Sequence, residues 1–424
     1  MNAFLYIFFV ITGEIKMKKL NRIIKMDSYD AVSFFNGLVF FAPVSLLVRT
    51  QAGVSQSMFF LLQALLSVIT FLGEIPTGFL TDRIGYKRSL VLSQGLLLLA
   101  RFLLFVSFIC KSPVLFSVEA IVEGLSYCFV SGTDSAYVYE VYGTKNYLSK
   151  MTHASNCGTA GFLISTVVYV VIYHVFNIEG LLLSTIATSM AAAFFSFKLK
   201  KEPSKVIGQK EPQNKTTSYT ENDQDNKNME NCHPLKRLFS TMKHPKALLF
   251  AVELSVFQVS WLLINFFYVE KLETCGISVE WMSAVILGYS AVEMLAEPII
   301  RKIGNAFSKK WAFVFGVASG IGFLLFGFIS HKIPVVALML ILPLLLKLSE
   351  YFVMEQENIL VDLLGVKTQR AAALSILNMG VSIMEILALF ASAVLTAVGI
   401  GWFFIGVGML LIICMFCIFG IDNQ

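Results

Sequence analysis

The stretch GEIPTGFLTDRIGYKRSL, residues 73–90, places three glycines, a proline and five charged side chains between two long apolar runs. The chain around it is 56% hydrophobic and only 14% charged, whereas a soluble domain carries about 25% charged residues. Many of its runs reach the roughly 20 apolar residues that span a bilayer. Because these runs are continuous rather than alternating, they predict helices and not a barrel. The composition therefore predicts an all-α membrane protein.

The apolar runs predict twelve membrane spans, separated six and six by a polar segment. The predicted spans are 29–49, 54–80, 89–110, 114–141, 152–177, 179–199, 246–269, 279–300, 309–330, 333–360, 370–397 and 400–420. The polar segment 201–244 has the composition of a disordered linker. We expect an N-terminal segment (1–28), a first bundle (29–200), the linker, a second bundle (245–420) and a short tail (421–424).

The distribution of basic residues predicts the orientation of the spans. With the N-terminus in the cytoplasm, 27 of the 33 Lys and Arg residues face the cytoplasm, four face the opposite side, and two lie within spans. Cytoplasmic loops carry an excess of Lys and Arg. We therefore expect both termini and the linker to be cytoplasmic.

The two halves share a weak internal repeat. Matching residues recur at an offset of 222, where Glu140, Gly143, Asn156 and Gly158 correspond to Asp362, Gly365, Asn378 and Gly380. At an offset of 219, Glu74 and Gly85 correspond to Glu293 and Gly304. A parallel repeat of six spans predicts two pseudo-symmetric bundles, which is typical of a transporter with its binding site between them.

The opening stretch forms the predicted end of span two, a turn and the start of span three. Gly78 and Gly85 permit close helix approach and a tight turn, and Pro76 is expected to bend span two. The charged residues of the turn lie at the membrane face, where opposite charges can lock one conformation and release another; they are Asp82, Arg83, Lys87 and Arg88.

The segment GFLTDRIGYKRSL, residues 78–90, resembles the loop signature G-x-L-x-D-R-x-G-R-K of the major facilitator superfamily, with Tyr86 in place of a basic residue. EIPTG before it and SGTDSAYVYE, residues 131–140, resemble a bacterial subgroup usually described as drug or metabolite exporters. The resemblance implies the fold of that superfamily, with twelve transmembrane helices in two bundles, and a location in the bacterial cytoplasmic membrane.

The resemblance also implies a conformational gate. Asp82 is expected to cap the start of span eleven near residues 369–373, where a helix N-terminus favours an anion, and Arg83 is expected to pair with Glu140. In the second half, Asp362 is expected to pair with one of two basic residues, Arg301 or Lys302. Since Arg301 occupies the position equivalent to Asp82, the second gate cannot work identically.

Charged side chains inside the spans are further candidates, because a charge at mid-bilayer costs roughly 2.5–3.5 kcal/mol. Five are expected in the cytoplasmic third, where ion pairing or support of the gate is their predicted role: Glu74, Asp134, Glu253, Glu293 and Glu297. Lys347 and Glu350 lie three residues apart and so share a helix face. They are expected to neutralise each other or to line a cavity.

Span four carries Glu119 and Glu123, which lie four residues apart on one face. Two like charges in a low dielectric disfavour simultaneous ionisation, so one carboxyl is able to carry a proton, while Arg101 is expected to hold one ionised. Glu123 is therefore the leading candidate for proton coupling or substrate binding. Asp134 and Glu385 are further candidates, with a structural hydrogen bond as the alternative for Asp134.

These features predict a secondary active transporter and not an enzyme. The sequence contains no phosphate-binding P-loop, no HExxH or GxSxG motif and only five His, and we expect no metal site and no cofactor beyond a proton gradient. The predicted function is proton-coupled efflux of a small amphiphilic compound or drug by an antiporter. An importer or uniporter of a nutrient is the alternative, and a non-transporting receptor or intramembrane enzyme is a different class. We expect a monomer whose partners are its small-molecule substrate and the lipid bilayer, without nucleic acid.

Overall fold

The regular structure of the described residues is entirely helical. The computed structural model describes residues 26–202, 245–277, 281–304, 308–363, 369–395 and 400–421. Most of the predicted linker and N-terminal segment lies outside these residues. Within them, six helices are long and apolar enough to cross a membrane. The prediction of an all-α membrane protein is confirmed.

The helices of the N-terminal half follow one another closely along the chain. They are α3 (Ser28–Gly37), η1 (Ala42–Val44), α4 (Ser45–Gln51), α5 (Gln56–Ile84), α6 (Tyr86–Cys110), α7 (Pro113–Val130), α8 (Thr133–Tyr142) and α9 (Thr144–Phe197). α9 consists of two helices that meet at Asn177, where φ is 53° and ψ is −153°. This kink separates the predicted spans five and six.

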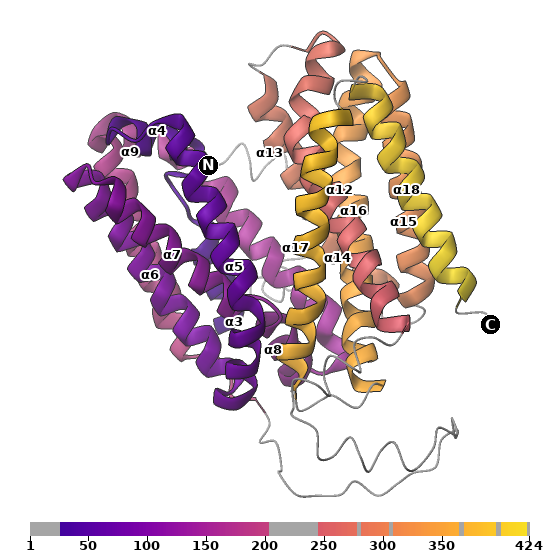
Figure 1. The fold of residues 1–424 in the computed structure, drawn as a ribbon, viewed down its shortest axis with the longest axis horizontal. Coiled ribbons are helices and arrows are strands. Elements are labelled where there is room, and N and C mark those ends of the chain that lie inside the picture. Colours follow the sequence, from indigo (N-terminus) through magenta and orange to yellow (C-terminus); the bar gives the residue numbers. More distant parts are fainter. Residues whose placement is uncertain are drawn as a thin grey trace, which may run out of the picture.

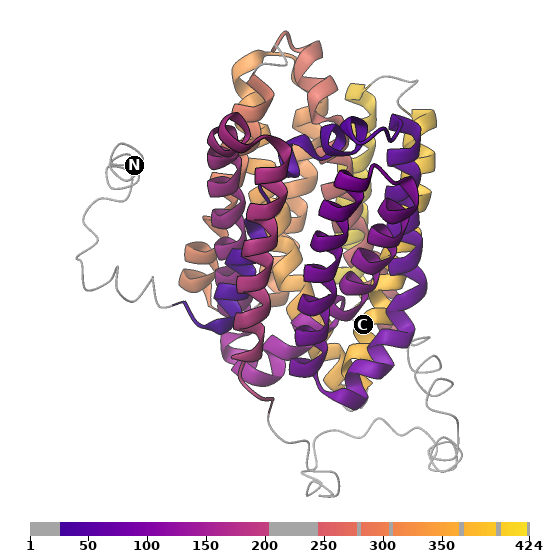
Figure 2. The same ribbon diagram turned by 90° about the vertical axis from the view of Figure 1, so that its left-hand side faces the viewer.

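The described helices of the C-terminal half are α12 (Pro245–Thr274), α13 (Met282–Glu293), α14 (Ala296–Ile303), α15 (Ser308–Phe328), α16 (Lys332–Leu363), α17 (Arg370–Leu395) and α18 (Ile400–Ile421). Each of the twelve predicted spans overlaps one or more helices of the described chain. The two halves form separate bundles that lie side by side (Figure 1), and the view turned by 90° shows the helices of both running along one common direction (Figure 2).

Three predicted spans are broken rather than continuous, which corrects the sequence-based boundaries. Span one stops at Gly37 and resumes at η1, where Pro43 cannot donate a backbone hydrogen bond. Span four divides into α7 and α8 at Gly132, whose φ of 68° is incompatible with a helix. Span eight divides into α13 and α14, because Pro298 has no N–H to offer the carbonyl of Met294.

Two of these breaks are joined to the opposite bundle. The Met294 carbonyl left free by Pro298 accepts a hydrogen bond from Asn156 Nδ2 at 2.7 Å. The repeat-related Asn378 donates through Nδ2 to Ser131 Oγ at 3.1 Å, beside the break between α7 and α8. The internal repeat thus places an asparagine of each bundle against a helix break of the other.

Candidate functional site

The end of α5 contacts the beginning of α17 across the two bundles. Asp82 accepts hydrogen bonds from the backbone N–H groups of Ala371 and Ala372, at 3.1 and 3.0 Å. The approach is close, because a Cβ at Gly78 would lie 2.8 Å from Ser375 Oγ. Asp82 therefore caps α17 within the range 369–373, as the resemblance implies, and the glycine makes the contact possible.

Arg370, the first residue of α17, is the centre of the ion pairs at this end. Its Nε donates to Glu140 Oε1 at 3.0 Å, its Nη2 pairs with Asp362, and its Nη1 donates to Asn358 Oδ1 at 3.2 Å. The side chain is almost fully buried. We call Asp82, Glu140, Asp362 and Arg370 the interbundle cluster, since it joins α5 and α8 to α16 and α17.

The interbundle cluster corrects two predicted ion pairs. Glu140 pairs with Arg370 and not with Arg83, whose side chain is exposed. Asp362 also pairs with Arg370, while Arg301 pairs with Glu297 on its own helix. Sequence spacing could not identify Arg370 as the partner of Glu140 and Asp362. Its position at the start of a predicted span is that of an ordinary basic residue of a cytoplasmic loop.

Hydrogen bonds from α8 extend the contact between the bundles. Tyr139 donates through its hydroxyl to Asp362 Oδ2 at 2.9 Å. Asn358 Nδ2 donates to Ser135 Oγ at 2.9 Å and to the Tyr147 hydroxyl at 3.3 Å. Within the first bundle, Ser131 Oγ donates to Glu74 Oε1 at 3.3 Å, while the same hydroxyl accepts from Asn378 of the second bundle. The segment 131–140 that carries part of the family resemblance is therefore an interface between bundles.

The remaining residues of the opening stretch act within the first bundle. Gly85 forms the turn between α5 and α6 with a φ of 95°. Lys87 donates through Nζ to the Leu199 carbonyl at 2.5 Å, which ties the start of α6 to the end of α9. Arg88 is exposed, and Pro76 lies inside α5, which continues as one helix from Gln56 to Ile84.

A cavity of about 350 Å³ lies between the bundles and is lined by residues of both. Its lining residues are Tyr29, Ser33, Asp134, Met151, Ala154, Ser155, Gln258, Trp261, Glu293, Lys347, Glu350, Tyr351 and Met354. A second cavity, of about 480 Å³, shares several of these residues and adds Tyr289 and Ser290. The structure thus brings four predicted candidates, Asp134, Glu293, Lys347 and Glu350, to one space.

The charges in this cavity are only partly neutralised. Lys347 pairs with Glu293 of α13 rather than with Glu350 on its own helix, and both Lys347 and Glu350 line the cavity, which was the alternative expected for them. Glu350 accepts a hydrogen bond from Gln258 Nε2 at 2.5 Å, and Asp134 Oδ1 accepts one from the Ser135 backbone at 2.7 Å. Within the described lining, three carboxyl groups face one ammonium group, which leaves two negative charges when all are ionised.

A second group of predicted residues lies inside the first bundle, away from the lining of both cavities in the described chain. Of the two glutamates expected as partners, Arg101 pairs with Glu123 at 2.9 Å, and the Tyr127 hydroxyl donates to the same oxygen at 2.8 Å. Glu119 is 3.5 Å from Arg49. Arg49 lies at the end of the predicted span one, and no sequence pattern marked it as a buried partner of Glu119.

Two candidates have side chains outside the described part of the chain. Glu253 lies in α12 and Glu385 in α17, and only their helical backbone is described. The cavity also contains residues that were not singled out by charge, namely Tyr29, Gln258 and Tyr351. The sequence alone does not show whether an aromatic or amide side chain in an apolar span lines a cavity or packs against another helix.

Comparisons with known proteins agree with this architecture. The family model described as Major Facilitator Superfamily matches residues 31–354. No curated protein sequence matches the chain. The chain is similar to a solved structure of a variant of the E. coli Fucose:proton symporter, FucP, with 14% identity, a TM-score of 0.69, and coverage of 94% of this chain and 98% of that chain.

Two further solved structures show the same likeness. FucP in the outward conformation has 13% identity and a TM-score of 0.71, covering 95% of this chain and 99% of that chain. The human organic anion transporter MFSD10 (TETRAN) has 12% identity and a TM-score of 0.67, covering 92% and 97% of the two chains. The structural likeness shows the fold, and the family model spans most of the chain. The chain therefore belongs to the Major Facilitator Superfamily, and it is an integral membrane transporter rather than an enzyme.

Proposed function

We propose that the protein is a proton-coupled exporter of small organic cations, which exchanges substrate for protons by alternating access. The observation that carries this proposal is the cavity between the bundles, whose described lining combines three carboxyl groups with a single ammonium group. Such a surplus of negative charge favours a cation and disfavours an anion. A cavity of about 350 Å³ is within the size range of small-molecule sites.

Aromatic rings in the same cavity support a cationic substrate. Trp261 and Tyr289 form an edge-to-face pair with ring centroids 6.3 Å apart, and Tyr29 and Tyr351 also line the space. The faces of such rings attract ammonium groups, by about 0.5–2 kcal/mol at each contact. An amphiphilic amine satisfies both features, because its charge meets a carboxylate and its apolar part meets the rings.

Asp134 and Glu350 are the proposed exchange sites. In the described lining, the carboxylates of Asp134 and Glu350 accept hydrogen bonds from neutral groups, whereas the carboxylate of Glu293 forms an ion pair with Lys347. A carboxylate can be neutralised by a proton or by the substrate cation, and competition between the two is the basis of antiport. Glu123 is a weaker candidate, because Arg101 already neutralises it inside the first bundle.

The interbundle cluster supports a defined transport state. If both termini are cytoplasmic, as the basic residues predict, Asp82, Glu140 and Arg370 lie at the cytoplasmic end. Their cross-bundle contacts then close the cytoplasmic side, and the structure corresponds to an outward-facing state. The likeness to FucP in the outward conformation is consistent with this assignment. Export requires that the cluster open to admit substrate from the cytoplasm.

The test is a transport assay with the purified protein in liposomes that contain a pH-sensitive dye. Lipophilic cations, aromatic amines, fucose and a carboxylate are added separately while internal pH is recorded. We expect proton movement with the cations, its loss in Asp134→Asn or Glu350→Gln, and its persistence in the matched variant Glu123→Gln. Proton movement only with fucose supports an importer instead. Equilibration of labelled cation without proton movement supports a uniporter.

A further inference from the structure

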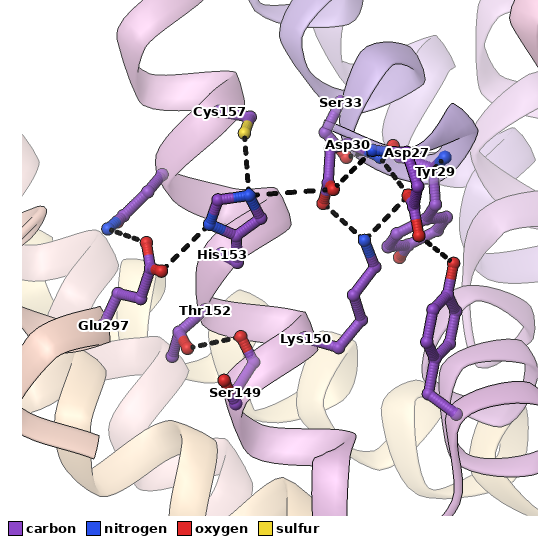
Figure 3. Close-up of polar contacts among 12 residues, drawn as sticks. Asp27, Tyr29, Asp30, Ser33, Ser149, Lys150, Thr152, His153, Cys157 and Glu297 are labelled. Atoms are coloured by element: carbon purple, nitrogen blue, oxygen red, sulfur yellow. Dashed lines mark hydrogen bonds and ion pairs between the residues drawn. The ribbon is translucent and has the colours of Figure 1, made fainter. Parts of the chain in front are cut away.

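Asp30, His153 and Cys157 form a mixed cluster of side chains able to bind a metal, where α3 and α9 meet beside Glu297 of α14 (Figure 3). Ser33 and Ala154, from the same two helices α3 and α9, line the cavity. His153 Nε2 is 3.6 Å from Asp30 Oδ2 and 3.9 Å from Cys157 Sγ. One ligand atom from each of these three residues lies within 4.8 Å of the others. The proposed exchange of substrate for protons does not use this cluster.

Two of the three candidate ligands, His153 and Asp30, are held in place by a neighbour. His153 Nδ1 is 2.9 Å from Glu297 Oε1, so the imidazole turns its other nitrogen toward Asp30 and Cys157. A carboxylate on the remote nitrogen of a histidine is the usual support for a metal-bound imidazole. Lys150 lies 2.6 Å from Asp30 Oδ1, which leaves Oδ2 directed at the histidine.

The charge and the type of donor atom indicate which ion fits. Lys150 is shared with the second carboxylate Asp27, at 2.7 Å, so its positive charge is already balanced. One sulfur, one imidazole nitrogen and one carboxylate oxygen suit Zn²⁺ and similar transition metals, whereas Mg²⁺ and Ca²⁺ prefer oxygen alone. With bonds of about 2.0–2.3 Å, the three side chains need to move together by less than about 1 Å.

We propose that Asp30, His153 and Cys157 bind one divalent transition-metal ion of the zinc class, which stabilises the state in which the bundles meet at this end. The three ligands belong to the first bundle, whereas Glu297 belongs to the second. The ion polarises the imidazole and strengthens its hydrogen bond to Glu297. Metal binding is thereby linked to closure of the two bundles. Because transport requires the bundles to separate at this contact, the bound ion acts as an inhibitor of transport.

The sequence alone predicts no metal site, because its local pattern does not bring these three residues together. His153 and Cys157 lie four residues apart on one helix face. The third ligand, Asp30, comes from a helix more than a hundred residues earlier in the chain. No contiguous motif joins them, and only the packing of α3 against α9 brings them together.

The site is tested with Co²⁺ and Zn²⁺ on the purified full-length chain in detergent, without a transport assay. We expect one Co²⁺ per chain, with the absorption band of a thiolate–cobalt bond. Cys157→Ser removes this band and His153→Gln weakens binding at least 100-fold. Cys110→Ser, which removes an exposed free cysteine on α6, is the matched control and leaves binding unchanged.

The link to closure is tested by Glu297→Gln and by distances between spin labels on the two bundles. We expect a 10- to 100-fold loss of metal affinity in Glu297→Gln, as is typical of such supporting carboxylates, and more of the closed state when Zn²⁺ is added. A Co²⁺ band that survives in Cys157→Ser, or that is lost equally in Cys110→Ser, overturns the site. Unchanged distances and affinity overturn the link to closure, whatever the transport assay shows.

Discussion

Replacing Asp82 by Asn tests the interbundle cluster most directly. The Asp82 carboxylate accepts hydrogen bonds from two backbone N–H groups of α17, at 3.1 and 3.0 Å. Asn keeps one acceptor oxygen and turns an NH₂ group toward the other N–H, so one hydrogen bond is lost and the remaining one loses its charge. Hydrogen bonds to charged groups contribute about 1.5–3 kcal/mol each. We therefore expect Asp82→Asn to destabilise the closed contact by about 2–3 kcal/mol, or about 30- to 150-fold in population.

The populations can be measured by double electron–electron resonance between spin labels at Asn146 and Lys302. Both positions are exposed and lie on different bundles, on α9 and α14. The labels are placed by Asn146→Cys and Lys302→Cys in a background without native cysteines. We expect the ratio of short to long distances to fall strongly in Asp82→Asn.

The control for this experiment is Arg83→Gln, which alters the exposed neighbour of Asp82. Because Glu140 pairs with Arg370 and not with Arg83, this variant is expected to keep the wild-type distance distribution. A wild-type distribution in Asp82→Asn, or an equal shift in Arg83→Gln, would refute the assignment of the closing contact.

Three further predictions follow from the same structure. Gly78→Val is expected to reduce the closed population at least as much as Asp82→Asn in the same distance measurement, because its Cβ would lie 2.8 Å from Ser375 Oγ; an unchanged distribution would contradict the close approach. Arg370→Gln leaves the partly exposed carboxylates of Glu140 and Asp362 without their shared cation and is expected to cost less than the roughly 3–5 kcal/mol of a fully buried pair, seen as a lower melting temperature in detergent than that of Arg88→Gln. Asp27→Ala removes the cap of α3 and is expected to cost about 0.5–2 kcal/mol. Burial raises the pKa of Asp27, but its hydrogen bonds with Lys150 and Tyr142 lower the pKa to about 2. Because the pKa of Asp27 in the folded protein lies below its ordinary value, the stability that Asp27 contributes is constant above about pH 5 and is lost as pH falls through the folded pKa. Equal stability of the wild-type protein and Asp27→Ala at neutral pH would contradict this prediction.

Several properties of the site were visible in the sequence because they depend on local patterns. Asp82 lies three residues before the turn at Gly85, within the segment that resembles the superfamily signature, and that resemblance implied that it caps α17. A pairing of Arg101 with one of Glu119 and Glu123 was also expected, because a charge inside an apolar span needs a partner, and the structure shows that the partner is Glu123. Asn156 and Asn378 were recognised as repeat partners, although their cross-bundle hydrogen bonds were not foreseen.

Other properties could not be predicted because they depend on which helices meet. The partner of Glu140 is Arg370, which lies 230 residues later, and no spacing rule selects it over the nearer Arg83. The partner of Lys347 is Glu293 on another helix, although Glu350 is closer along the chain. In both cases the tertiary contact prevailed over the local one.

The sequence by itself determined the membrane class, the order of the apolar spans with their approximate bounds, and the family resemblance. Hydropathy acts along the chain, so twenty apolar residues predict a span wherever its neighbours lie. The tertiary structure alone decided the helix breaks, the role of Arg370, the charge of the cavity and the cluster of Asp30, His153 and Cys157. The physical reason is that ion pairs and metal ligands act over a few ångströms in space, and the packing of two bundles brings together side chains that no local pattern relates.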